Sequence, residues 1–320
     1  MIADFIASRA GAFVAIGTAA CWTVTALSFE SAGRRVGSLP VNLIRLVMAL
    51  MVFALFGLIT RGTVLPAAIG ANQAVWLLLS GLVGFVIGDM FLFQAFVTVG
   101  ARLSMLIYSS VPVITAILGR VFLDERLAGL DLVGMGITIA GIVLVVLKAP
   151  AKVHTEDHVL HAVAVGVNED LPTEAPHRLR GMLLAFGGAL GQAGGLVLAK
   201  FGATDGYDAF SATQIRTIAG IVGFSLLFVV LRKWRPTFAA LKDGPAMRRI
   251  ATGAFFGPFL GVSLGLLAAQ LSSTGVAATI MATVPVLIIA PSVFLFGEKA
   301  TPREVLGAVV AVAGVSLLFI

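Results

Sequence analysis

The stretch that decides the fold is residues 88–147, which reads GDMFLFQAFVTVGARLSMLIYSSVPVITAILGRVFLDERLAGLDLVGMGITIAGIVLVVL. It returns 173 positions later as residues 261–320, GVSLGLLAAQLSSTGVAATIMATVPVLIIAPSVFLFGEKATPREVLGAVVAVAGVSLLFI. Both copies contain an apolar helix, a small-residue turn, an apolar helix with an internal proline, an acidic turn and another apolar helix. Matching positions include Val111 and Val284, Pro112 and Pro285, Glu125 and Glu298, Gly134 and Gly307, and Gly141 and Gly314.

The segments before this stretch repeat as well. Residues 11–17 resemble residues 181–187, which lie 170 positions later, and residues 42–45 resemble residues 213–216, 171 positions later. Because the shift changes so little, the whole chain divides into two halves of five helices each. Duplicated hydrophobic bundles are the usual build of secondary transporters.

The composition indicates an all-α integral membrane protein. Hydrophobic residues make up 59% of the chain and charged residues only 12%, whereas soluble domains are about one quarter charged. The net charge of +6 belongs to the loops, where it suits anionic lipid rather than nucleic acid. The lone cysteine, Cys21, excludes a disulfide framework and is interpreted as a small core residue.

We expect ten transmembrane helices, because apolar runs of about 20 residues can cross a bilayer. The first half covers residues 1–148, a polar linker covers 149–178, and the second half covers 179–320. The first apolar run is too long for a signal-peptide core and has no small-residue cleavage site after it. The expected helices are 11–29, 40–60, 74–99, 103–123, 130–147, a sixth ending at 200, 209–231, 250–271, 276–296 and 302–320.

The linker carries His154, His158 and His161 at a spacing that would align them on a helix face. A zinc site is one interpretation of this pattern, but a solvated polar linker is favoured, and we expect no metal and no cofactor. We therefore predict that replacing all three histidines with alanine leaves activity intact. A chelator-sensitive activity that the triple variant loses would contradict this.

Glycines recur every fourth residue in two of the expected helices, which places them on one face and lets a neighbouring backbone approach. Tight packing explains such ladders, and they also fit sliding seams during alternating access. One ladder contains Gly187, Gly191 and Gly195, and the other contains Gly253, Gly257, Gly261 and Gly265.

These features resemble the EamA-type transporters of the drug/metabolite transporter superfamily. The resemblance rests on Gly88-Asp89, Gly100-Ala101, Val111-Pro112-Val113 and Glu125, together with the two five-helix halves. It implies ten helices as two inverted repeats, a central cavity, and movement of a small organic metabolite, amino acid or drug-like solute. We expect an exporter in the bacterial inner membrane, in contact with lipid bilayer and solute, and its oligomeric state is not predicted.

Asp89 lies about 15 residues into the helix expected at 74–99, close to the middle of the membrane at ~1.5 Å per residue. A carboxylate is costly there and needs a reason. One interpretation is a cavity-facing group that takes up a proton or contacts a cationic group, and the other is a structural partner of a buried arginine or amide. The position has no acidic repeat mate, because Val262 occupies it in the second half. We hypothesise that Asp89 couples transport to protons.

Arg45 and Arg216 are repeat mates near the start of their helices. They either extend toward the nearer interface or contact an anion, one at each mouth of the pathway. Hydrogen-bonding side chains on other helices are candidates for substrate contacts or for links between helices. They are Gln94, Tyr108, Gln192, Gln214 and Gln270.

The acidic turns repeat with basic neighbours, Arg126 beside Glu125 and Lys299 beside Glu298. Charges at helix ends favour a structural role, such as an ion pair that fixes the turn. Pro112 and Pro285 lie inside expected helices, where proline opens a backbone hydrogen bond. We expect a kink at each, which serves either packing or a hinge.

Other chemistries lack their motifs. The sequence has no HExxH, no glycine-rich phosphate loop and no histidine inside an expected membrane helix. An uncoupled facilitator or channel is the main alternative to a carrier, and a membrane-embedded enzyme is the other. Saturable uptake with counterflow separates a carrier from a channel, and substrate turnover in detergent reveals an enzyme.

The orientation in the membrane is left open by two opposing observations. Five lysines and arginines lie on the side of the N-terminus and fifteen on the other, so the positive-inside rule puts both termini outside. The family resemblance favours termini inside. The charge count is preferred, and labelling of a Ser8→Cys, Cys21→Ala variant with an impermeant reagent tests it.

Overall fold

The computed structural model describes residues 9–108, 110–146, 175–204, 206–287 and 302–318. The described part is all-helical and contains six helices that are long and apolar enough to cross a membrane, together with three shorter apolar helices. This confirms a multi-pass integral membrane protein. Ten spanning helices and the inverted relation between the halves stay predictions. The polar linker and its histidines lie outside the described residues.

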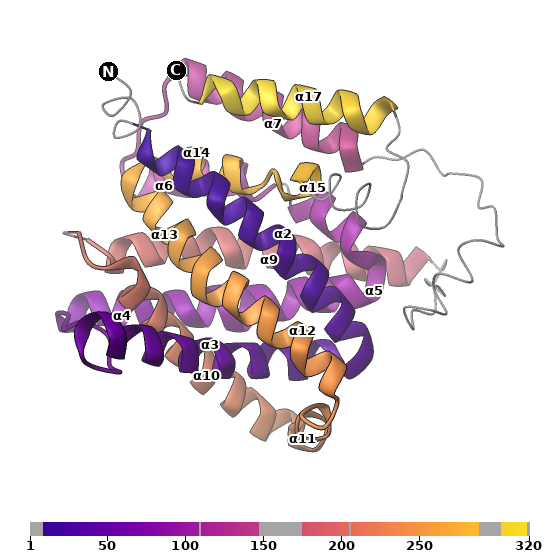
Figure 1. The fold of residues 1–320 in the computed structure, drawn as a ribbon. Helices are drawn as coiled ribbons and strands as arrows, with labels where there is room; N and C mark the ends of the chain where they lie inside the picture. Colours follow the sequence, from indigo (N-terminus) through magenta and orange to yellow (C-terminus); the bar gives the residue numbers. More distant parts are fainter. Residues whose placement is uncertain (1–8, 109, 147–174, 205, 288–301, 319–320) are drawn as a thin grey trace.

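The first two helices of each half are long and uninterrupted (Figure 1). In the first half, α2 (Ala10–Val36) and α3 (Ser38–Arg61) meet at Gly37, whose φ of 90° favours glycine. In the second half they correspond to α9 (Ala175–Gly202) and α10 (Ala209–Leu231). The bounds of α10 are those that the sequence predicts.

The third helix of each half contains a π-helical segment, and the two segments lie at the same repeat position, 173 residues apart. A π-helix inserts an extra residue into the turn, and such segments are common at functional sites. The elements are α4 (Ala71–Gly81), η1 (Leu82–Gly88) and α5 (Asp89–Tyr108) in the first half, and α12 (Gly244–Ala254), η2 (Phe255–Gly261) and α13 (Val262–Leu271) in the second.

The predicted boundary between the third and fourth helices is wrong in the first half. The sequence predicts a turn between residues 99 and 103, but α5 continues through Tyr108 and α6 (Val111–Phe122) begins after it. In the second half the turn is present, because Ser272 is extended and α14 (Thr274–Met281) follows it. The glycine and alanine of the first half are compatible with one helix, whereas serines bond to nearby backbone and favour a helix end.

The prediction that each proline kinks the interior of a helix is also wrong. Pro112 is the second residue of α6, and Pro285 is the second residue of α15 (Val284–Leu287). At the start of a helix the missing N–H of proline costs no hydrogen bond, so proline is well suited to this position. Each proline therefore marks the point where one helix ends and the next begins. These two helix breaks occur at matching positions of the two halves.

The fifth helices, α7 (Gly129–Val146) and α17 (Pro302–Leu317), pack against each other along one edge of the molecule (Figure 1). Glycine makes this contact close, since a Cβ on Gly141 would lie 2.7 Å from the Cα of Ala311.

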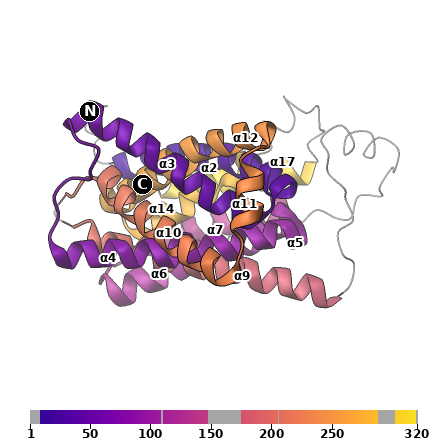
Figure 2. The ribbon, with the colours of Figure 1, turned by 90° about the horizontal axis from the view of Figure 1, so that it is seen from below.

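The first helix of each half packs on the third helix of the other half (Figures 1 and 2). Along α9, a Cβ on Gly191 would lie 2.8 Å from the backbone nitrogen of Gly88 in η1. Along α2, a Cβ on Gly261 of η2 would lie 2.6 Å from Cδ1 of Trp22. The two glycine ladders are therefore the seams that join the halves.

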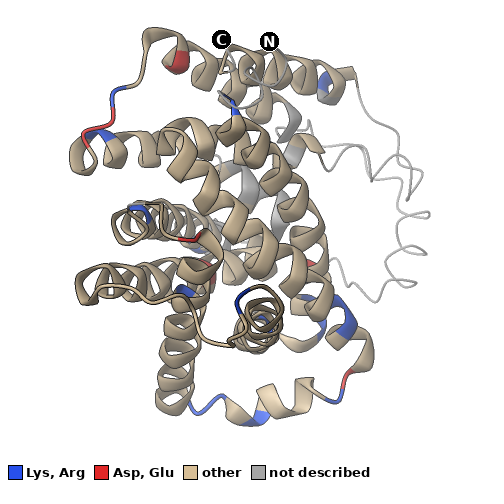
Figure 3. Ribbon diagram, turned by 60° about the vertical axis from the view of Figure 1, so that its left-hand side comes forward, with Lys and Arg blue, Asp and Glu red and all other residues tan. Residues whose placement is uncertain are grey.

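The basic segment expected between the seventh and eighth helices contains a short helix, α11 (Trp234–Ala240), and the start of α12. Figure 3 shows lysine and arginine gathered at this end of the molecule, while the helices between the two ends are almost free of charge. This distribution fits a bundle whose middle lies in hydrocarbon.

Candidate solute-binding cavity

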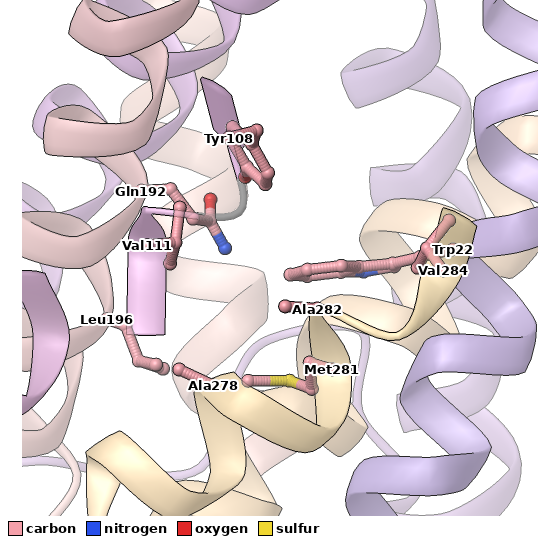
Figure 4. A pocket seen from close by; sticks show the side chains of 9 residues that line it. All are labelled: Trp22, Tyr108, Val111, Gln192, Leu196, Ala278, Met281, Ala282 and Val284. Atoms are coloured by element: carbon pink, nitrogen blue, oxygen red, sulfur yellow. The ribbon is translucent and has the colours of Figure 1, made fainter. Parts of the chain in front are cut away.

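A cavity lies where the two helix breaks, one before α6 and one before α15, face each other. The end of α5 and the start of α6 form one wall, and the end of α14 and the start of α15 form another, with α2 and α9 completing it (Figure 4). The residues that line it are Trp22, Tyr108, Val111, Gln192, Leu196, Ala278, Met281, Ala282 and Val284.

Repeat mates line this cavity in pairs. Trp22 and Gln192 are 170 positions apart and come from α2 and α9; Figure 4 shows the indole and the amide entering from opposite walls. Matching positions of two similar halves therefore meet around one space. The other two pairs, each 173 positions apart, are Tyr108 with Met281 and Val111 with Val284.

A second chamber shares Trp22, Tyr108, Gln192 and Val284 with the first, so the two are adjacent. It extends to charged residues and is walled by phenylalanines. Its other lining residues include Thr25, Phe29, Arg45, Phe85, Asp89, Phe93, Phe96 and Gly257.

The carboxylate of Asp89 accepts a hydrogen bond from Nη2 of Arg45, and the two residues form an ion pair. Asp89 is the first residue of α5, directly after η1, and Arg45 lies on α3. Both are buried, with exposed fractions of 9% and 4%. A buried arginine was one of the two partners that the sequence left open for Asp89, and the structure shows that it is the partner.

Aromatic rings surround the guanidinium of Arg45. Its Cζ lies 4.7 Å from the ring centre of Phe93 and 5.3 Å from that of Phe29. A guanidinium within about 6 Å of a ring face is attracted to its electron density. The sequence could not show this arrangement, because it depends on how α2, α3 and α5 are rotated about their axes.

Arg216 lies in the same region as Arg45, although it comes from α10. Its Cζ is 5.1 Å from the ring centre of Phe85, and the Cζ of Arg45 is 6.0 Å from the same ring. The prediction that these arginines reach an interface, or stand one at each mouth, is wrong. Arg216 is only 3% exposed, and the two repeat mates meet inside the bundle.

The family model that describes the EamA-like transporter family matches residues 9–147 and 179–320. The chain belongs to the EamA-like transporter family. This confirms the resemblance found in the sequence and makes the chain a membrane transporter of the drug/metabolite type. The two matched ranges contain every residue of the cavity.

The fold of this EamA-like chain is similar to that of a solved structure titled only as the crystal structure of a protein. The TM-score is 0.65 at 14% sequence identity, and the match covers 96% of this chain and 95% of the other. At that identity the likeness shows the fold alone. No curated protein matches the chain.

Three of the five predicted hydrogen-bonding residues of this EamA-like chain act as links between elements. Gln94 accepts a hydrogen bond of 3.0 Å from the hydroxyl of Ser38. Gln214 donates to a carbonyl of the segment between α3 and α4 at 2.8 Å. Gln270 donates to two carbonyls near the end of α9, at 2.8 and 2.9 Å. Only Tyr108 and Gln192 of this group border the cavity.

Glu125 makes a contact that sequence reasoning missed. Its carboxylate accepts hydrogen bonds from Lys200 Nζ at 2.6 Å, from the Thr274 amide at 2.9 Å and from the Thr274 hydroxyl at 2.7 Å. The sequence paired Glu125 with its neighbour Arg126, but the structure joins it to residues far along the chain. Glu298, its repeat mate, lies outside the described residues. We call Glu125, Lys200 and Thr274 the clamp.

The clamp lies next to the cavity. Lys200 is one turn along α9 from Leu196, and Thr274 is one turn along α14 from Ala278, and both Leu196 and Ala278 line the cavity. The clamp therefore ties the first half to the second at one end of the cavity.

The predicted glycines of η2 and α13 also lie at the cavity or beside it. Gly257 lines the second chamber, and Gly261 leaves room for the Trp22 indole. A Cβ on Gly265 would be 3.1 Å from the sulfur of Met281, another lining residue. Within the described ranges, no group of three or more histidine, cysteine, aspartate or glutamate side chains is placed to hold a metal.

Proposed function

We propose that this EamA-like protein is a carrier that moves a small organic solute through the central cavity by alternating access. The observation that carries the proposal is that repeat mates from the two halves line one cavity. The helix breaks before α6 and α15 both border this cavity. In secondary transporters, solute sites lie at the interface of internal repeats and use discontinuous helices.

The proposal includes ten helices arranged as two inverted repeats. Its support is the direction of the first helices. Gly11 at the start of α2 and Lys200 near the end of α9 both contact Ser272, so these repeat mates run in opposite directions.

The described conformation supports a cycle in which the halves separate. The second chamber, which contains Arg45 and Asp89, has a volume of about 80 Å³, whereas small-molecule sites typically have ~300 Å³ or more. A solute therefore needs a wider cavity. Releasing the clamp at one end, with sliding along the glycine seams, would provide it.

We further propose Asp89 as the residue that couples transport to protons. It is the only acidic residue among those that line the described cavity, and its carboxylate holds Arg45. Protonation would remove the charge that binds Arg45 and so would change the polarity of the chamber. Proton uptake by Asp89 would thus be coupled to breaking the buried ion pair between Asp89 and Arg45.

The test is solute flux in proteoliposomes. A thermal-shift screen of the purified protein against metabolite pools identifies a solute, since a ligand that binds only the native state raises stability. A carrier shows saturable uptake with counterflow, a channel shows neither, and an enzyme turns the solute over in detergent. Flux in inside-out and right-side-out membranes tests the expected export from a bacterial inner membrane.

A further inference from the structure

The middle of the bundle holds an unequal set of charges. Two arginines and one aspartate are buried there, and Asp89 is already paired with Arg45. Arginine stays protonated in proteins, so the group carries one uncompensated positive charge, on Arg216.

Arg216 has no acceptor within the described part of the chain. Its guanidinium makes no hydrogen bond and no ion pair there, and its Nε is buried without a partner. The Nε of Arg45 is also buried and unbonded. Buried polar atoms in folded proteins almost always have partners, and an unpaired one calls for an explanation. The face of Phe85 lies against Arg216, and the Asp89 carboxylate, which is already bound to Arg45, attracts Arg216 from nearby.

Arg45 lines one end of the chamber, and Arg216 lies beside that end, against Phe85, without lining the chamber in the described conformation. Phe85 lines the chamber together with Arg45 and Asp89, and both guanidiniums lie against its ring. The planar fork of a guanidinium matches a carboxylate with two parallel hydrogen bonds. An anionic group bound at Phe85 would satisfy both unbonded donors and balance the charge.

We propose that the Phe85 end of the chamber binds the carboxylate of the transported solute, with Arg216 as its main partner. The remaining walls are aromatic, with Trp22, Phe29 and Phe96, so the body of the solute is apolar. The solute class is an organic monocarboxylate with an apolar or aromatic body. This inference rests on the proposed carrier function and specifies its substrate class.

The headgroup series tests the proposal directly. The purified full chain in lipid nanodiscs is titrated with four probes that share one body: 3-phenylpropionate, 3-phenylpropionamide, 3-phenylpropylamine and phenylalanine. We expect 3-phenylpropionate to raise the unfolding temperature with an apparent affinity at least about tenfold higher than those of the amide and the amine, since both lack the carboxylate that accepts the charged hydrogen bonds. Phenylalanine keeps this carboxylate and tests whether the site tolerates an added ammonium group. Equal affinity for the amide or the amine would overturn the proposal.

Two variants locate the site. Arg216→Gln is expected to weaken 3-phenylpropionate binding at least about tenfold, while the unliganded protein does not lose stability, because an unpaired buried charge is removed. Arg120→Gln, at an exposed arginine on α6, is the control and binds like the wild type. Unchanged binding by Arg216→Gln would overturn the proposal, and if that variant does not fold, the headgroup series on the wild type decides.

Flux measurements separate this inference from the carrier proposal. Binding of 3-phenylpropionate that depends on Arg216, without counterflow, keeps the anion site and contradicts the carrier. Counterflow of the amide or the amine that is insensitive to Arg216→Gln keeps the carrier and contradicts the anion site.

Discussion

Replacing Glu125 with glutamine should open the cavity at the clamp. Glutamine keeps one oxygen to accept from Thr274 but places an NH₂ group against the ammonium of Lys200. The 2.6 Å ion pair, whose side chains are 12% and 23% exposed, is lost. A hydrogen bond to a charged group contributes ~1.5–3 kcal/mol, and partial exposure lowers this value. We therefore take ~2 kcal/mol as the free energy by which the ion pair stabilises the closed state relative to the open state.

This energy predicts a measurable shift in the population of the open state. About 2 kcal/mol corresponds to a ~30-fold change in the ratio of open to closed protein. If the open state of the wild type is ~1% populated, as is common for minor states, the variant is open in ~25% of molecules.

The assay is thiol labelling of a cysteine inside the cavity. Met281→Cys in a Cys21→Ala background places a reporter in the lining, and nanodiscs expose both faces to a water-soluble maleimide. We expect Glu125→Gln to raise the labelling rate at least about tenfold under native conditions.

The matched control is Asp124→Asn. Asp124 is the neighbouring carboxylate, its side chain is 85% exposed and its φ is 51°, a conformation that asparagine tolerates. This control should label like the parent protein. If Glu125→Gln also labels like the parent, the clamp does not hold the cavity closed and the reasoning is refuted.

Three further predictions follow from the seams, the ion pair and a helix cap. Gly191→Ala places a methyl group against the backbone of η1 and should cost ~1–3 kcal/mol of stability, whereas Gly136→Ala, whose Cβ would contact nothing, should be neutral or slightly stabilising in thermal unfolding. Asp89→Asn should lose accumulation driven by a pH gradient but keep solute exchange, and unchanged pH dependence in liposomes would make Asp89 a packing residue. At the start of α12, a backbone hydrogen bond and the Arg35 guanidinium lower the pKa of Asp243 from 3.8. Its stabilising contribution is therefore present above 3.8 and lost as the pH falls through the lowered pKa, so Asp243→Asn should remove that part of the acid dependence of the unfolding temperature.

The sequence predicted the long helices well because hydrophobic length and the repeat both constrain them. α10 has the predicted bounds, and the repeat shift of 173 recurs in the two π-helices. The positions where helices end were harder to predict. Small residues such as Gly100 and Ala101 are compatible with either a turn or a helix, and the packing around α5 decides between them.

The site could be predicted only in part, because rotation of a helix about its axis depends on its neighbours. The sequence singled out Asp89, Arg45, Tyr108 and Gln192, which border the cavity. It could not show that Arg45 and Arg216 meet at one ring. It also missed the clamp, whose partners are 75 and 149 residues from Glu125, a separation at which no local pattern gives a signal.

The most direct test of alternating access is to lock the clamp and measure counterflow. Glu125→Cys of the first half and Thr274→Cys of the second, in a Cys21→Ala background, are joined by a short thiol crosslinker that reductant cleaves. Crosslinked proteoliposomes should lose counterflow, and reduction should restore it to the level of the uncrosslinked variant. Counterflow that continues through the crosslinked protein would contradict the account.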